Sequence, residues 1–130
     1  MSLIRNSNQV KQAIDFSGIQ SGKIHPSDID AVLEFDNDIL ILIEVKRKGN
    51  KIPTGQRLLL ERVCDNWKTK RSVVLFVTHQ VYDTTKDINL SKCIVEKVYW
   101  RKQWRDNKNK DIINLLNELG KYWKSNKLKI

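Results

Sequence analysis

Three residues whose side chains suit phosphodiester hydrolysis stand in the first half of the chain: Asp30, Glu44 and Lys46. Hydrolysis of a phosphodiester needs a cation that neutralises charge in the transition state and lowers the pKa of the attacking water, and carboxylate oxygens are ligands that Mg²⁺ prefers. A lysine beside such an ion can orient or deprotonate the water, or stabilise developing negative charge. The set predicts a metal site in which the two carboxylates bind the ion and the lysine assists the water.

The segments that carry these residues are expected to form a hairpin of two strands, over 28–35 and 38–47. Side chains two apart on a strand share a face, so Glu44 and Lys46 project the same way. The turn between the strands then folds Asp30 back towards them. Two carboxylates and an amine are therefore expected at one end of the hairpin.

The second strand is apolar around Glu44 and Lys46. This context distinguishes the two residues from charged residues at an ordinary solvated strand end. Leu40 and Leu42 share the face of Glu44, so the charged groups emerge from an otherwise apolar face, where solvated charge has no structural purpose. One alternative stays open, because Asp28 lies on the same face as Asp30 and competes with it as a ligand. Asp30 is favoured because its distance from the turn better matches the opposed Glu44.

The rest of the chain predicts an α/β fold with the element order α-β-β-α-β-β-α. The expected elements are a short helix beginning near Ser7, the two strands above, a helix over 54–70, strands over 73–78 and 94–100, and a helix over about 109–123. A strand, a crossover helix and another strand favour parallel pairing of the two inner strands. The fold class predicted is a single domain over 1–130, with a central mixed four-stranded sheet flanked by helices.

Charge indicates the partner. The chain has 24 Lys and Arg against 15 Asp and Glu, a formal charge of +9. Residues 97–130 hold ten of these cations and three of the acids, so a basic C-terminal helix at about 109–124 is expected. Such an excess suits a polyanion, and nucleic acid is the predicted partner.

Aromatic residues interleave with cations near the C-terminal end. Tyr99, Trp100 and Trp104 alternate with arginine and lysine, a combination suited to stacking on unpaired bases. Core aromatics beneath a basic surface explain the same residues, and both interpretations stay open.

Cysteine content and hydropathy indicate the compartment. Two cysteines, Cys64 and Cys93, are too few for a disulfide scaffold, which favours a reducing environment. The longest apolar run, from Ile39 to Ile43, is too short to span a bilayer, and no signal-peptide pattern opens the chain. We expect a cytoplasmic protein with no membrane partner.

Residues of about 7–80 resemble the PD-(D/E)xK nuclease superfamily, the restriction-endonuclease-like fold shared by restriction enzymes and archaeal Holliday-junction resolvases. The resemblance rests on an Asp before a strand-borne Glu-x-Lys, and on the glutamine that opens the next helix. It implies that Asp30, Glu44 and the backbone carbonyl of Val45 bind the metal ion, Mg²⁺ or Mn²⁺. It also implies that Lys46 assists the nucleophile, and that Gln56 orients the water or contacts the substrate backbone.

The function that follows from this resemblance is metal-dependent endonucleolytic hydrolysis of DNA. A chain this short leaves no separate domain for reading sequence, which favours selectivity for structure, such as branched DNA. A homodimer would supply the two sites needed to cut two strands. The alternative is a non-catalytic nucleic-acid-binding module on the same fold.

Overall fold

The computed structural model describes residues 14–20, 22–23 and 26–130, which form an α/β fold around one mixed sheet. The strands are β1 (Ala31–Phe35), β2 (Ile39–Arg47), β3 (Ser72–His79), β4 (Ile94–Trp100) and β5 (Gln103–Asp111); the α-helices in this part of the chain are α2 (Thr54–Asp65) and α3 (Ile112–Tyr122), with 3-10 turns η1 (Ser17–Ile19) and η2 (Leu90–Lys92). Most of the helix expected near Ser7 lies outside the described residues.

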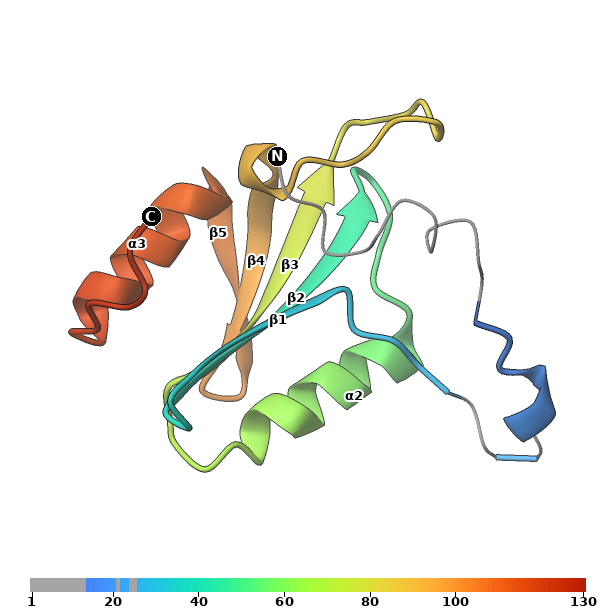
Figure 1. The fold of residues 1–130 in the computed structure, drawn as a ribbon, viewed down its shortest axis with the longest axis horizontal. Helices are drawn as coiled ribbons and strands as arrows, with labels where there is room; N and C mark the ends of the chain where they lie inside the picture. Colours follow the sequence, from blue (N-terminus) through green and yellow to red (C-terminus); the bar gives the residue numbers. More distant parts are fainter. Residues whose placement is uncertain (1–13, 21, 24–25) are drawn as a thin grey trace.

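The five strands lie in the order β1-β2-β3-β4-β5 (Figure 1). β1 and β2 form the expected antiparallel hairpin, and its turn places Asp36 and Asn37 at positive φ, a conformation that these two residue types tolerate. β2 and β3 pair in parallel across α2, as predicted, and the remaining pairs are antiparallel. In this register Glu44 lies beside Phe76, and Lys46 lies beside Thr78.

The predicted four-stranded sheet is wrong by one strand, because residues 103–111 form β5 at the edge of the sheet. Their sequence, QWRDNKNKD, contains one large apolar residue, and none of the nine side chains is buried. An edge strand pairs on one side only and tolerates polar side chains, so hydropathy gives little sign of it. α3 consequently begins at Ile112 and not near 109, and the Asp111 carboxylate caps it by accepting the Asn114 N–H at 2.8 Å.

Each face of the sheet packs against its own helix, as Figure 1 shows. Ile39, Ile41 and Ile43 belong to the core on the α3 side. Leu40 and Leu42, which alternate with them, pack with Leu60 and Cys64 of α2. β2 is therefore buried on both faces, as expected of a central strand.

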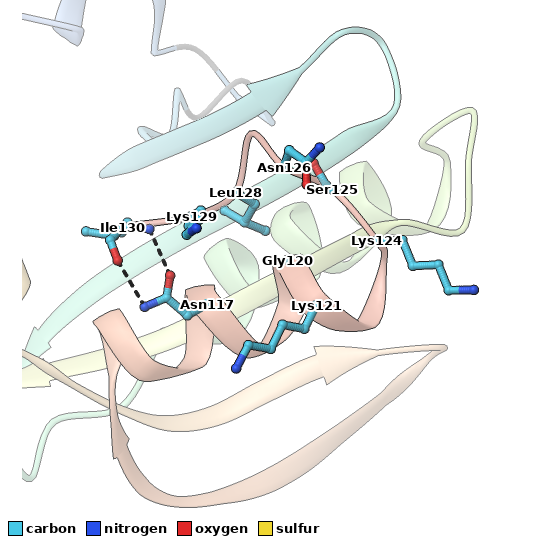
Figure 2. Close-up of a pocket in the computed structure, with 9 residues that line it drawn as sticks. All are labelled: Asn117, Gly120, Lys121, Lys124, Ser125, Asn126, Leu128, Lys129 and Ile130. Carbon is cyan, nitrogen blue, oxygen red and sulfur yellow. Dashed lines mark hydrogen bonds between the residues drawn. The ribbon is translucent and has the colours of Figure 1, made fainter.

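The C-terminal residues fold back along α3 (Figure 2). Asn117 accepts the Ile130 N–H at 2.8 Å, and Leu128 is buried against the helix. A Cβ at Gly120 would lie 2.0 Å from the Leu128 carbonyl oxygen, so glycine is required there. The helix itself is not basic as predicted: its charged residues are Glu118 and Lys121, and the excess lies in the β4–β5 turn, on β5 and in the last residues.

Among the described residues, no helix has both the length and the apolar character needed to cross a membrane.

Candidate active site

Glu44 is a buried carboxylate near the end of a central strand. Its side chain continues the row of Leu40 and Leu42 on the α2 side of the sheet, and it is only 1 % exposed. Three more residues of β2 follow it before the loop that leads into α2, so the carboxylate lies just inside the edge of the apolar core. Burial of a charged group at this depth is costly unless the group is paired or bound to a metal ion.

The two oxygens of Glu44 differ in their surroundings. Oε1 accepts a hydrogen bond from Gln56 Nε2 at 2.8 Å and lies 3.4 Å from Lys46 Nζ. Oε2 is buried without a hydrogen-bond partner, and it is the one such side-chain atom in the part of the chain that the structure describes. Because native proteins rarely leave a buried polar atom unpaired, Oε2 is the atom of this site that most needs a ligand.

Asp30 lies beside Glu44, immediately before β1. Its Oδ2 accepts the Val45 N–H at 2.7 Å, which ties the exposed aspartate to the strand that carries Glu44. The N–H and C=O of one strand residue point to the same side, so the Val45 carbonyl also faces Asp30. Pairing between β1 and β2 stops at Ala31 and Ile43, which leaves that carbonyl beyond the ladder.

The alternative ligand Asp28 occupies a different place. Its backbone carbonyl accepts a hydrogen bond from Gln56 Nε2 at 3.3 Å, and its side chain is exposed. The carboxylate that raises the pKa of Glu44 is that of Asp30. The geometry therefore favours Asp30 over Asp28 as the partner of Glu44.

The pKa of Glu44 is shifted by its burial and by the charged groups beside it. Burial raises the pKa of Glu44 from its ordinary 4.5 to about 7, and the adjacent Asp30 carboxylate adds to the increase. The Lys46 ammonium acts in the opposite direction but does not offset the other two effects. Burial of Glu44 and the adjacent Asp30 carboxylate disfavour the state in which both are ionised, and a side-chain hydrogen bond to Asp30 favours the protonated form of Glu44.

A divalent cation would bind the unpartnered Oε2 of Glu44. Its positive charge would also offset the repulsion between the Glu44 and Asp30 carboxylates. Three or more His, Cys, Asp or Glu side chains do not gather into a metal-binding group among the described residues. Two carboxylates and a backbone carbonyl remain, all hard oxygen donors. Mg²⁺ is commonly held by one or two carboxylates, with water and substrate phosphate oxygens completing its coordination, so the donor set fits this ion.

The structure also places Lys46 and Gln56 at the site, as predicted. Lys46 is partly exposed, at 26 %, and its ammonium reaches Glu44 from the strand end that opens to solvent. Gln56 lies in the first turn of α2, and its amide bridges Glu44 and the Asp28 carbonyl. In this structure Gln56 fixes the orientation of the Glu44 carboxylate.

Comparison of the chain with protein-family models, with curated proteins and with solved structures gives no match. Function must be inferred from the geometry of the site and from the charge of the chain.

The aromatic residues divide between the two faces of the sheet. Tyr99 is buried, its hydroxyl donates to Asp65, and its ring lies 5.3 Å from that of Trp104. Trp104 donates its indole N–H to Glu61 at 2.9 Å. Tyr99 is a core residue beneath α2, so the base-stacking interpretation is wrong for it, and the partly buried Trp104 packs against the same core. Sequence patterning could not separate them from Trp100, whose ring lies beneath the Arg101 guanidinium at 4.5 Å.

Proposed function

We propose that this chain is a metal-dependent endonuclease that hydrolyses phosphodiester bonds in DNA, on a core of the restriction-endonuclease-like type. The observation that carries the proposal is the buried Glu44 carboxylate with one unpartnered oxygen, set beside a second carboxylate and an ammonium. A buried carboxylate with a raised pKa beside a second carboxylate is typical of functional sites, and its unpartnered oxygen is free to bind a cation.

Each residue then has a definite task. Asp30, Glu44 and the Val45 carbonyl would hold Mg²⁺ or Mn²⁺, which when bound supplies Lewis acidity to a phosphate oxygen and lowers the pKa of an attacking water. Lys46 lies at the solvent side of Glu44, where its ammonium can orient that water or stabilise negative charge on the phosphate. Gln56 keeps Glu44 Oε1 occupied, so that Oε2 points to the ion.

The substrate class is inferred from the charge of the chain. The formal charge of +9 supports a polyanionic substrate, and none of the described contacts suits recognition of a base sequence. We infer selectivity for DNA structure, such as a branch, over a long cognate sequence. A homodimer would bring two such sites to two strands.

The test is cleavage of duplex, single-stranded and four-way-junction DNA with Mg²⁺, Mn²⁺ or EDTA. Wild type is compared with Asp30→Asn, Glu44→Gln and Lys46→Ala, and Glu34→Gln serves as a control that removes an exposed carboxylate from β1. We expect metal-dependent cutting that falls about a hundredfold or more in the three site variants and is unchanged in the control.

Two results would contradict the proposal. Equal cutting by wild type and the three site variants would place the activity elsewhere. Salt-sensitive DNA binding by wild type without cleavage of any substrate would favour the non-catalytic nucleic-acid-binding module.

A further inference from the structure

A cationic surface lies at the other end of α2 from Glu44. We name it the distal basic hollow; it has a volume of about 630 Å³ and lies between the end of α2, the loop before β3 and the β4–β5 turn. Lys68, Lys70, Arg101 and Lys102 contribute four positive charges to it. Of the described residues that line it, Asp65 alone is acidic, and its carboxylate already accepts the Tyr99 hydroxyl at 2.9 Å.

The β4–β5 turn presents two of these cations at a conformational cost. Arg101 and Lys102 have φ values of 50° and 65°, in a two-residue turn that ordinarily favours Asn-Gly. The β1–β2 turn meets the same need with Asp36 and Asn37. Neither Arg101 nor Lys102 forms an ion pair within the described part of the chain. Arg101 stacks on the Trp100 ring at 4.5 Å, and neither charge is neutralised by an acidic side chain in the described part of the chain.

The separation of the two sites follows from two independent elements. Leu40 of β2 pairs with Ser72 of β3, which lines the hollow. The distance along β2 from Glu44 back to Leu40 is four residues, or about 13 Å. Along α2, the nine residues from Gln56 to Asp65 span about 14 Å. Both elements connect the candidate active site to the hollow, and Figure 1 shows the β4–β5 turn at the same end of the sheet as the loop after α2.

We propose that the distal basic hollow binds the phosphate backbone of the DNA molecule whose phosphodiester enters the site at Glu44. This inference rests on the proposed nuclease function, and it adds a minimum length to the substrate. At 3.4 Å per base pair, 13 to 14 Å corresponds to about four base pairs. A duplex arm that ends closer than this to the scissile bond does not reach the near rim of the hollow at Asp65 and Ser72, and Arg101 and Lys102 lie two strands farther across the sheet.

The experiment uses the double variant Arg101→Asn with Lys102→Gly, which removes two cations and installs the residues that the turn favours. The control is Lys121→Gln with Lys124→Asn, which removes two cations at the end of α3, on the other face of the sheet. Binding of a labelled duplex of about 20 base pairs is measured by anisotropy in EDTA, at about 50 to 200 mM salt. Thermal melting of both variants is recorded.

We expect the turn variant to melt at a higher temperature than wild type and yet bind DNA more weakly. Loss of two phosphate contacts lowers the slope of log Kd against log salt concentration by about 1.8. From about 50 to 200 mM salt, the factor by which Kd rises is therefore about twelvefold smaller for the turn variant than for wild type. The control should change the slope by less. Equal slopes for the two double variants, or an unchanged slope in the turn variant, would overturn the assignment. These outcomes hold whether or not wild type cuts DNA, so failure of the proposed nuclease activity is recognised separately.

The length requirement is tested with the same proteins and Mg²⁺. Wild type should have a lower KM for duplexes that extend more than about four base pairs beyond the cut than for shorter ones. The turn variant should lose this difference in KM. A length dependence that survives in the turn variant would contradict the assignment.

Discussion

Replacement of Glu44 by glutamine should make the metal-free protein more stable at neutral pH. The side chain is almost fully buried, its Oε2 has no hydrogen-bond partner, and Asp30 lies beside it. Glutamine has nearly the same shape and carries no charge. Its carbonyl can still accept the Gln56 amide, so the substitution removes the buried charge and keeps the principal contact.

The magnitude follows from the pKa of Glu44. Between pH 4.5, where an ordinary glutamate titrates, and about 7, the folded chain holds a proton at Glu44 that the unfolded chain has released. Stability therefore falls as pH rises through this window, because the native state binds more protons than the unfolded state. At about 1.4 kcal/mol per pH unit, the loss amounts to about 3 kcal/mol by pH 7.

The assay is urea unfolding in EDTA at several pH values from about 4.5 to 8. The free energy of unfolding of wild type is subtracted from that of Glu44→Gln, so that titrations common to both proteins cancel. The difference should be small at the acid end and rise to about 3 kcal/mol in favour of glutamine at neutral pH. Mg²⁺ should stabilise wild type at pH 8 and leave Glu44→Gln unchanged, because the ion binds the ionised carboxylate.

A difference that stays flat with pH would refute the reasoning, since it would mean that Glu44 ionises in the folded state at no cost. The same pH series on Glu34→Gln shows how much of any slope comes from removal of an exposed carboxylate. Stabilisation of wild type and Glu44→Gln by Mg²⁺ to the same extent would place the ion at another site.

Three further predictions concern single positions. Gln56→Leu should lower kcat about tenfold in single-turnover cleavage with little change in DNA affinity, because Glu44 loses the amide that orients it; an unchanged kcat would contradict this role. Lys46→Arg should cleave more slowly than wild type although the charge is kept, because the guanidinium is larger and does not release its proton; rates at several pH values check this. Gly120→Ala should destabilise the fold by about 2 kcal/mol in urea, whereas Gly55→Ala, with nothing within 4 Å of its Cβ position, should not.

The sequence predicts the residues of the candidate site more completely than it predicts the elements of the fold. Strand parity alone places Glu44 and Lys46 on one face, and the hairpin turn returns Asp30 to them, so their proximity follows from local rules. The structure brings these three residues and Gln56 together. What local rules do not supply is the depth of Glu44 and the different surroundings of its two oxygens, since both depend on how α2 packs over the sheet.

The parts that sequence patterning missed have a common physical origin. β5 is paired to β4 on one side and buries no side chain, so it lacks the apolar alternation by which strands are recognised. Its turn, Arg101-Lys102, lacks the Asn-Gly or Asp-Gly signal of a two-residue hairpin. Backbone pairing forms this hairpin without local sequence support, and the distal basic hollow depends on it.

Glu44 and the β4–β5 turn both depart from what the fold alone would favour. An apolar residue at position 44 would extend the row of Leu40 and Leu42 into the α2 core, and a buried charge with an unpartnered oxygen is less stable there. Uncharged residues at 101 and 102 would likewise suit the turn better. The two departures lie at opposite ends of α2: Glu44 Oε2 has no hydrogen-bond partner, and Arg101 and Lys102 form no ion pair within the described part of the chain. A divalent cation at one end and DNA phosphates at the other would compensate both.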